Sequence, residues 1–265
     1  MFTDFDAFGL DMVEITVDHH KSYADIDPGL IERNDVWLTP TVFLPGLLCD
    51  AALWRPQVDA LADHVAPHVA DLTLDDTIAA MARRVLTSAP QSFALVALSM
   101  GGYVALEIMR QAPERVTRLA LLDTSAHPDT EERAAVRRAG MASLQRGRFV
   151  GVTRSLLNTL VHPNNTVGPV ADALKSMAGR VGGPAFLRQQ CAILGRIDSR
   201  PYLTDIRVPT LVAVGDGDRV TPMRDAVEMA EAIDGAELHV FRDCGHLPAL
   251  ELADETSLLL RRWLQ

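Results

Sequence analysis

The segment FALVALSMGG, residues 93–102, places a serine between a buried apolar run and two glycines. Six apolar residues bounded by turn signals are typical of a fully buried strand. The helical pattern GGYVALEIMRQA follows at once, so the chain must turn sharply at Ser99. Such a turn strains its apex and requires small residues two positions before and after it, here Ala97 and Gly101. The segment therefore predicts a strand-turn-helix unit that presents one hydroxyl at the carboxyl edge of a sheet.

The rest of the chain repeats this alternation over residues 36–125 and 206–265. Short apolar runs that alternate with longer helical patterns predict βαβ units, and hence an α/β core with a mostly parallel sheet flanked by helices. The expected strands span residues 36–44, 68–72, 93–98, 116–123, 209–215 and 236–241. The expected helices span residues 52–63, 77–86, 101–112, 224–233 and 255–264. We expect Asp75-Asp76 to cap the second of these helices.

Residues 126–205 contain no convincing strand pattern and are rich in Arg, Gly, Ala and Leu. Helical patterns occur at 131–146 and 170–180, and strand patterns resume at Val208. We predict a helical cap inserted late in the sheet, with a separate domain as the alternative. Its larger apolar residues form either a pocket over the site or the cap's own core; they are Phe149, Leu156, Leu157, Leu160, Phe186 and Leu187.

Residues 1–35 fit the α/β pattern least. Residues 12–17 alternate like an edge strand, and the remainder is polar and irregular. The cluster Asp18-His19-His20 raises the question of a metal site, but adjacent histidines on an extended chain point to opposite faces. No third ligand is evident, so we expect neither a metal nor another cofactor.

Charge and apolar patterning exclude several classes of protein. A net charge of −10 argues against a nucleic-acid surface and against an anionic membrane face. The first residues lack the basic and apolar regions of a signal peptide, and no apolar run approaches membrane-spanning length. Three scattered cysteines are too few for a disulfide framework or a zinc site. We expect a cytoplasmic protein, monomeric or homodimeric, that acts on a small molecule.

A serine hydroxyl needs a base to act as a nucleophile at neutral pH. Of the eight histidines, His246 follows the apolar run 236–241 and so falls at the carboxyl edge of the predicted sheet. His64, His68 and His239 fall within helix or strand patterns, whereas His127 and His162 are placed to line a cleft. We therefore predict that His246 is the base.

The base in turn needs a carboxylate to orient its ring. Asp216 and Asp218 directly follow the buried run 209–215, and Asp123 ends the run 116–123. We favour Asp218, with Asp216 and Asp123 as alternatives. The resulting chain order, Ser, Asp, His, is the one known for α/β-hydrolases.

Two backbone amides are candidates to bind a developing oxyanion. The N–H of Met100 begins the helix after Ser99, where amides lack intrahelical acceptors. The second donor is expected in the loop after an early strand. The segment VFLPGLLCD supplies that loop, and Leu47 directly after Gly46 is its candidate donor.

Together these motifs resemble the α/β-hydrolase superfamily, in particular its small cofactor-independent carboxylesterase and enol-lactonase-like branch, over residues 36–265. The resemblance is carried by FLPGLLCDAALWRPQ, LSMGGYVALEIMRQAPERVTRLALLDT, VPTLVAVGDGDRVTP and CGHLPALE. The family motif G-x-x-D-x-x-x-P matches Gly215, Asp218 and Pro222, which supports Asp218 over Asp216. Two features depart from the family: Pro-Gly replaces the usual His-Gly at residues 45–46, and the usual D-x-x-G-x-G-x-S segment is missing after the next strand.

The resemblance implies a serine hydrolase that forms an acyl-enzyme on Ser99 with the help of Asp218 and His246. Few aromatic residues and no evident basic cluster at the site favour small, uncharged carboxylic esters. Alternatives on the same triad are a C–C bond hydrolase, an enol-lactonase, a thioesterase, an acyltransferase and perhydrolysis, and a more remote one is a non-catalytic ligand receptor. The predicted substrate contacts are Gly46, Phe149, Leu157, Leu160, Phe186 and Leu247.

Overall fold

The computed structural model describes residues 38–147 and 149–265. The predicted N-terminal segment 1–35, with its expected edge strand and the Asp18-His19-His20 cluster, lies outside the described residues. No helix among the residues described is long and apolar enough to cross a bilayer.

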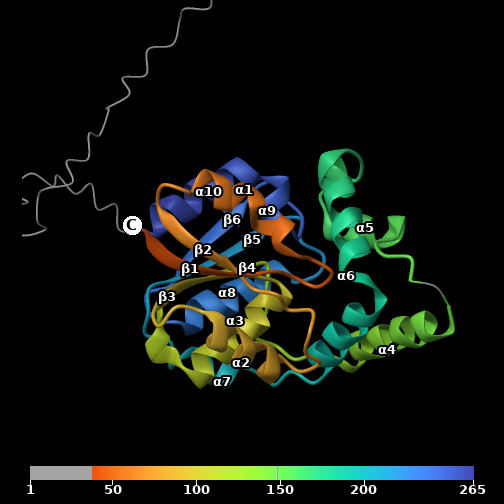
Figure 1. Ribbon diagram of the computed structural model, residues 1–265, viewed down its shortest axis with the longest axis horizontal. Helices are drawn as coiled ribbons and strands as arrows, with labels where there is room; N and C mark the ends of the chain where they lie inside the picture. Colours follow the sequence, from red (N-terminus) through yellow and green to blue (C-terminus); the bar gives the residue numbers. More distant parts are fainter. Residues whose placement is uncertain (1–37, 148) are drawn as a thin grey trace, which may run out of the picture. The chain divides into compact units, whose positions relative to one another are not determined.

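Six parallel strands form one sheet in the order β2-β1-β3-β4-β5-β6 (Figure 1). Strands β3 and β5 are buried at every position, as expected of parallel strands covered on both faces. The predicted α/β sheet is confirmed. The strands are β1 Thr39–Leu44, β2 Val65–Val69, β3 Phe93–Leu98, β4 Val116–Leu122, β5 Thr210–Gly215 and β6 Glu237–Phe241.

Helices cover the two faces of the sheet and enclose two apolar cores (Figure 1). One core lies between the sheet and α2 (Ile78–Ser88), α3 (Met100–Gln111) and α8 (Met223–Ala232). The other lies under the 3₁₀ helix η2 (Ala51–Trp54), α1 (Arg55–Ala60), α9 (Pro248–Glu251) and α10 (Ala253–Trp263). A further 3₁₀ turn, η3, spans Pro113–Arg115.

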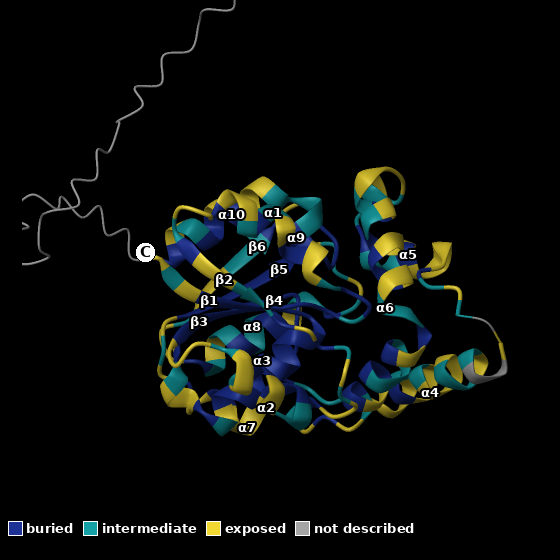
Figure 2. Ribbon diagram, in the orientation of Figure 1, coloured by how far each residue is buried: buried dark blue, intermediate teal, exposed yellow. Residues whose placement is uncertain are grey.

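The described residues between β4 and β5 are helical, as the sequence predicts. They form α4 (Glu131–Arg146), α5 (Arg154–Leu160), the turn η4 (Pro163–Asn165), α6 (Pro169–Leu194) and α7 (Arg200–Leu203). Helices α4, α5 and α6 lie beside the edge of the sheet, and α4 is exposed along most of its length, whereas α7 packs on α8 (Figures 1 and 2). We call α4–α6 the cap. Helix α6 extends well beyond the expected 170–180 and kinks at Gly182, whose φ is 74°.

Two local predictions are wrong. Strand β2 occupies 65–69 instead of 68–72, because its pairing with β1 starts at Thr39 opposite Val65. The cap of α2 is Thr77 and not Asp75-Asp76, because the Thr77 hydroxyl accepts the N–H of Ala80 while the Asp75 carboxylate pairs with Arg84.

The strand order places the loops of β1 and β3 next to each other. The chain runs from β1 outward to β2 and then returns to form β3 on the other side of β1. Ligands bind in open α/β sheets at such a reversal, outside the carboxyl ends of the strands. The loop after Leu44 and the turn at Ser99 therefore meet at one edge, beneath the cap.

Candidate active site

Ser99 occupies a strained turn between β3 and α3. Its φ of 54° and ψ of −115° lie where residues other than glycine are rarely found. The neighbouring glycines make the turn possible, because a Cβ at Gly101 would lie 2.4 Å from the Leu44 carbonyl oxygen and one at Gly102 would lie 2.2 Å from Thr124 Oγ1. The strain that the sequence predicts at the apex of the turn is present.

The backbone of Ser99 is anchored on both sides by the end of β4. Its N–H donates to the Leu122 carbonyl at 3.0 Å, and its carbonyl accepts the Thr124 hydroxyl at 2.7 Å. These bonds leave the side-chain hydroxyl free to face the cavity under the cap. The turn is thus fixed by its neighbouring strand and not by the serine side chain.

The structure brings together Ser99, His246 and Asp218. His246 Nε2 lies 2.7 Å from Ser99 Oγ, and Nδ1 lies 2.8 Å from Asp218 Oδ2. The three residues follow β3, β6 and β5 respectively, so the carboxyl edge of the sheet assembles them from positions up to 147 residues apart. His246 is 3% exposed, and the pair with Asp218 is shielded from water.

The Asp218 carboxylate accepts several further hydrogen bonds. Oδ1 accepts the N–H groups of Val220 and Thr221, and Oδ2 accepts the Thr221 hydroxyl at 2.7 Å. Burial opposes the ionised form of Asp218. The charge of His246, and hydrogen bonds from His246, Thr221 and Val220, nevertheless hold the pKa of Asp218 below its usual value. Asp218 is therefore an ionised partner for the imidazole.

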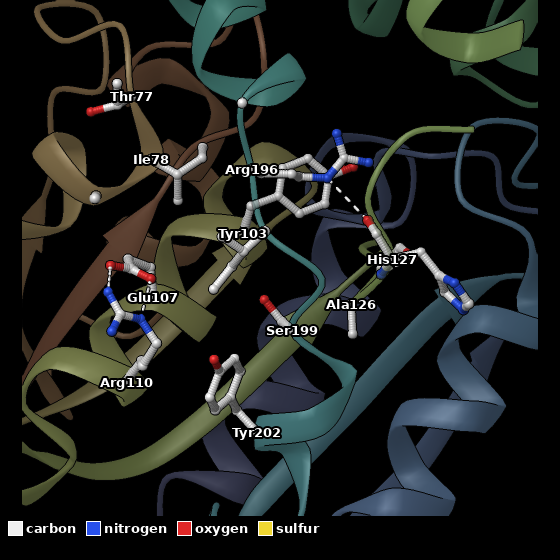
Figure 3. A pocket seen from close by; sticks show the side chains of 14 residues that line it. Thr77, Ile78, Tyr103, Glu107, Arg110, Ala126, His127, Arg196, Ser199 and Tyr202 are labelled. Carbon is white, nitrogen blue, oxygen red and sulfur yellow. Dashed lines mark hydrogen bonds and ion pairs between the residues drawn. The ribbon is translucent and has the colours of Figure 1, made fainter. Parts of the chain in front are cut away.

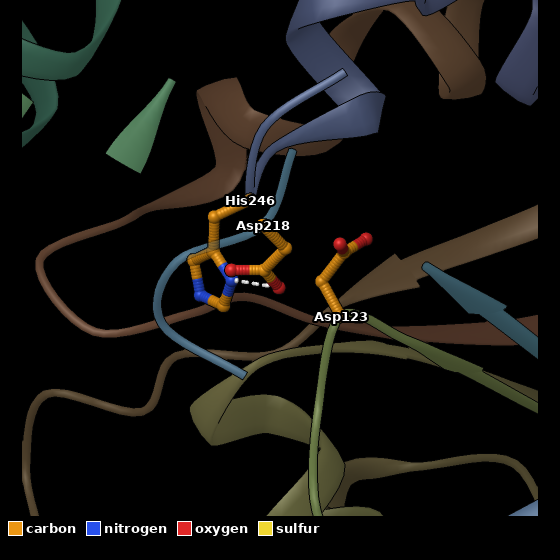
Figure 4. A group of neighbouring side chains, drawn as sticks. All are labelled: Asp123, Asp218 and His246. Atoms are coloured by element: carbon orange, nitrogen blue, oxygen red, sulfur yellow. Dashed lines mark hydrogen bonds and ion pairs between the residues drawn. The ribbon is translucent and has the colours of Figure 1, made fainter. Parts of the chain in front are cut away.

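The two alternative acids lie in different surroundings. Asp216 faces outward, where it accepts the Cys244 N–H at 3.4 Å and pairs with Arg242 at 3.7 Å. Asp123 is fully buried beside Asp218 and His246, with the three donor atoms within 4.8 Å of one another (Figure 4). The oxygens of Asp218 are already engaged by His246, Thr221 and two amides, so the cluster is a hydrogen-bonded network and not a vacant set of metal ligands.

Glu251 holds the loop of His246 from both sides, and its role is missed by the sequence prediction. Its Oε1 accepts the N–H groups of Gly245 at 3.1 Å and Leu247 at 3.2 Å. Its Oε2 accepts the His162 N–H at 2.7 Å and the Asn165 side-chain amide at 3.0 Å. One carboxylate thus fastens the histidine loop and ties it to η4.

The loop after β1 is also held by a residue that the sequence prediction missed. Leu48 has a φ of 60°, and its N–H donates to Gln189 Oε1 of α6 at 3.1 Å. Gln189 is fully buried and donates in turn to the Leu72 carbonyl. Within residues 38–147 and 149–265, neither Leu47 nor Met100, the expected oxyanion donors, has an acceptor for its N–H.

Comparison with known proteins agrees with this geometry. A sequence profile of the alpha/beta hydrolase fold matches residues 66–252. The chain belongs to the α/β-hydrolase family. It is 25% identical over 242 residues to a pimeloyl-[acyl-carrier protein] methyl ester esterase of Aliivibrio salmonicida, covering 84% of this chain and 91% of that protein.

Two solved structures resemble this α/β hydrolase at the same level of identity. A thermophilic esterase from Thermogutta terrifontis superimposes with a TM-score of 0.72 at 25% identity, covering 85% of this chain and 89% of the other. An enol-lactonase from Burkholderia xenovorans has a TM-score of 0.72 at 25% identity, covering 85% and 91%. The resemblance to the esterase and enol-lactonase-like branch is therefore confirmed at the level of family and fold.

A cavity of about 530 Å³ opens over Ser99 in this α/β hydrolase. Of the predicted contacts, Gly46, Leu160, Phe186 and Leu247 line it. Leu156, considered for the same pocket, lines it too. The wall thus combines the loop after β1, the histidine loop and the cap.

The predictions for Phe149 and Leu157 are wrong, since neither residue lines the cavity. Leu157 is 2% exposed and belongs to an apolar core, because its side chain points about 100° around α5 from that of Leu156. Phe149 packs against Phe186, which lines the cavity, with ring centroids 5.9 Å apart and the ring planes tilted by 43°. Leu187, considered with them, is also outside the lining.

The expectation that no basic cluster faces the site is also wrong. Arg133, Arg137 and Arg219 contribute to the cavity lining, along with Glu132. Arg137 pairs with Asp129 at 2.5 Å, a carboxylate that it shares with Arg196, and Arg133 donates to the Val220 carbonyl. The cavity of this α/β hydrolase is therefore apolar with guanidinium groups in its wall.

Two cysteines lie near the site as unreactive thiols. Cys49 lines the cavity, and burial, with the charge of Asp50, raises the pKa of its thiol to about 12. Burial and the charge of Glu251 likewise raise the pKa of the Cys244 thiol. Since thiolates are the nucleophilic form, neither group competes with Ser99.

A second cavity, of about 340 Å³, lies between α2, α3 and the chain before α7 (Figure 3). Tyr103 borders both cavities, and the Arg196 guanidinium stacks over its ring at 4.3 Å. His127 lines this cavity and its Nε2 lies 2.6 Å from Glu228. His127 is thus engaged with Glu228 and not with Ser99.

Proposed function

We propose that this α/β hydrolase is a carboxylic-ester hydrolase with Ser99 as its nucleophile. The observation that carries the proposal is the continuous hydrogen-bonded series from Ser99 Oγ through His246 to buried Asp218, at the base of an apolar cavity. The names of the relatives support the same reaction, because two of them are esterases.

In the proposed mechanism Ser99 attacks the acyl carbon of the ester. His246 Nε2 takes the hydroxyl proton while Asp218 accepts the Nδ1–H, which fixes the tautomer and stabilises the imidazolium. Collapse of the tetrahedral intermediate expels the alkoxide, which takes the proton from His246 and leaves as the alcohol. Water then adds to the acyl-enzyme with His246 as base, and the acid is released with Ser99 restored.

The amides of Leu47 and Met100 are the proposed donors to the oxyanion. Both are backbone groups of fixed loops, so they need no reorganisation when charge develops on the carbonyl oxygen. Removing one such donor costs about 2.7–4 kcal/mol of transition-state stabilisation in comparable sites. Leu47 depends on its neighbour Leu48, whose N–H is held by Gln189.

The proposed substrate is a small ester with an apolar acyl group. The aliphatic side chains of Leu156, Leu160 and Leu247 line the cavity and suit such a group. The preference for uncharged esters stays a prediction, and the arginines in the wall make it worth testing. A methyl alkanoate compared with the methyl half-ester of a dicarboxylic acid of equal length measures it directly.

The nucleophile is tested by Ser99→Ala. We expect wild-type protein to react with a fluorophosphonate probe at Ser99 and to hydrolyse p-nitrophenyl esters, and we expect the variant to do neither while keeping its fold by circular dichroism. Ser257→Ala is the matched control, because Ser257 is a buried serine of α10 whose hydroxyl donates to the Ala253 carbonyl. Ester turnover retained by Ser99→Ala would refute the mechanism.

A further inference from the structure

Asp123 is a buried carboxyl group that the proposed mechanism does not use. It directly follows β4 and is 0% exposed. Its Oδ1 accepts the Gly215 N–H at 2.9 Å, whereas Oδ2 has no hydrogen-bond partner among the described residues. Buried polar atoms are nearly always hydrogen-bonded. An unpartnered carboxyl oxygen therefore indicates that Oδ2 carries a proton and acts as a donor.

The acceptor for such a proton is Asp218. The two carboxyl groups lie side by side in the buried part of the site (Figure 4). One carboxyl oxygen each of Asp123 and Asp218 and one ring nitrogen of His246 lie within 4.8 Å of one another. Two adjacent carboxyl groups do not both ionise in such a place, because like charges repel strongly where water is excluded. Asp218 is the one stabilised as an anion, by His246, Thr221 and two amides.

The other titratable groups around Asp123 favour its neutral form. Glu251 of α9 adds a negative charge, and the Cys244 thiol lies close enough to Asp123 to feel its charge. The group that can become cationic there is His246, and Asp218 stands as its partner. Burial first, and then the charge of Asp218, raises the pKa of Asp123 well above its usual value.

The backbone at Asp123 is built to hold this position. Its φ is 44°, a left-handed conformation that aspartate tolerates better than most residues. The residues on either side, Leu122 and Thr124, bind the backbone of Ser99, while the Asp123 side chain binds Gly215 of β5. One short segment therefore spans the distance between the nucleophile turn and the acid loop.

We propose that Asp123 is a positioning residue: it stays a neutral acid that donates a hydrogen bond from Oδ2 to Asp218, so that Asp218 remains the oriented, ionised partner of His246. The proposal rests on the proposed function for its effect on catalysis. The protonation of Asp123 itself does not depend on the activity.

The kinetic test compares Asp123→Asn with Asp123→Ala. Asparagine keeps an oxygen for the Gly215 N–H and an N–H for Asp218, so we expect it to retain most of kcat. Alanine removes the donor and with it one of the bonds that orient Asp218, so we expect kcat to fall by up to about 100-fold with KM little changed. Equal damage by both variants would overturn the proposal, because it would mean that a negative charge at Asp123 is required. A fall in melting temperature for Asp123→Ala with kcat intact would overturn it as well.

The protonation test is infrared spectroscopy of the full chain at neutral pH. The difference spectrum of wild type minus Asp123→Asn should contain the C=O stretching band of a neutral carboxylic acid. Asp225→Asn is the matched control, because Asp225 is a buried aspartate of α8 that pairs with Arg224. Its difference spectrum should contain carboxylate bands only.

The two tests separate the failure of this inference from the failure of the proposed function. A missing acid band refutes the neutral Asp123 whatever the enzyme hydrolyses. Ester turnover retained by Ser99→Ala refutes the mechanism, and the infrared band then still decides whether Asp123 carries its proton.

Discussion

The sheet side and the cap side of the cavity differ in what holds their residues in place. On the sheet side, Ser99, Asp218 and His246 follow directly after strands, and backbone hydrogen bonds anchor their loops. On the cap side, the wall consists of side chains from helices, among them Leu156, which is 37% exposed. By comparison Ser99 is 9% exposed.

This difference separates two kinds of requirement. Chemistry needs atoms placed within fractions of an ångström, and the ends of buried parallel strands provide that placement. Binding of an apolar group needs only surface of suitable shape, which helices beside the sheet can supply. Substitutions on the sheet side should therefore change kcat, and substitutions on the cap side should change KM and chain-length preference.

The largest effect is expected for Asp218→Asn. The amide can no longer fix the imidazole tautomer that His246 needs, so we expect kcat to fall by about 10⁴-fold in p-nitrophenyl ester hydrolysis. Asp216→Asn is the matched control, because Asp216 lies two residues away and pairs with the exposed Arg242. An exposed ion pair contributes about 0–1 kcal/mol to the free energy of folding. Its loss should leave the fold intact and kcat near the wild-type value. Comparable losses in both variants would contradict the assignment of the acid.

An intermediate effect is expected for Gln189→Leu. This variant tests whether every substitution in the cap acts on KM and leaves kcat unchanged. Gln189 belongs to the cap but binds the Leu48 N–H in the loop of the proposed oxyanion donor. Leucine leaves that buried N–H without an acceptor, so the free energy of unfolding should fall by about 1–3 kcal/mol. We expect kcat to fall between about 10- and 100-fold as the loop shifts.

The neighbouring Gln190→Leu is the control for that experiment. Gln190 lines the cavity and accepts a hydrogen bond from Arg137, so its loss should act mainly on KM. If Gln189→Leu also changed only KM, the bond from α6 to the loop of Leu48 would have no part in the chemistry.

The sheet side is also the part that the sequence predicts best. The strand over residues 93–98 has the predicted bounds, because the turn signals on either side of a buried apolar run mark where the strand begins and ends. The position of His246 just after a predicted strand indicates its role, and the resemblance to the family favours Asp218. Strand ends are local features of the sequence, and the parallel sheet brings them to one edge.

The cap side is predicted poorly because its outcome depends on packing. The sequence shows that helices form there, but the contacts of the whole helix decide which face of α5 meets the cavity. The pocket prediction for Leu157 is wrong for that reason. Gln189 and Glu251 were missed for a similar reason. Gln189 binds a backbone N–H 141 residues away, and Glu251 joins its own loop to the N–H of His162, 89 residues away. No local pattern marks such long-range bonds.

The smallest effect on catalysis is expected for Leu156→Ala, which pairs with Leu157→Ala as its control. Leu156 lines the cavity, so its loss should raise KM for longer acyl esters more than for acetate, with kcat little changed. The binding free energy should weaken by about 0.8 kcal/mol for each methylene of the substrate that loses its contact. Leu157 is 2% exposed and outside the lining, so Leu157→Ala should lower the free energy of unfolding by about 2–5 kcal/mol and leave the chain-length profile as in wild type. Adjacent leucines of one helix would then separate binding from stability. A chain-length profile that moves with Leu157 and not with Leu156 would reverse the assignment of the two faces of α5.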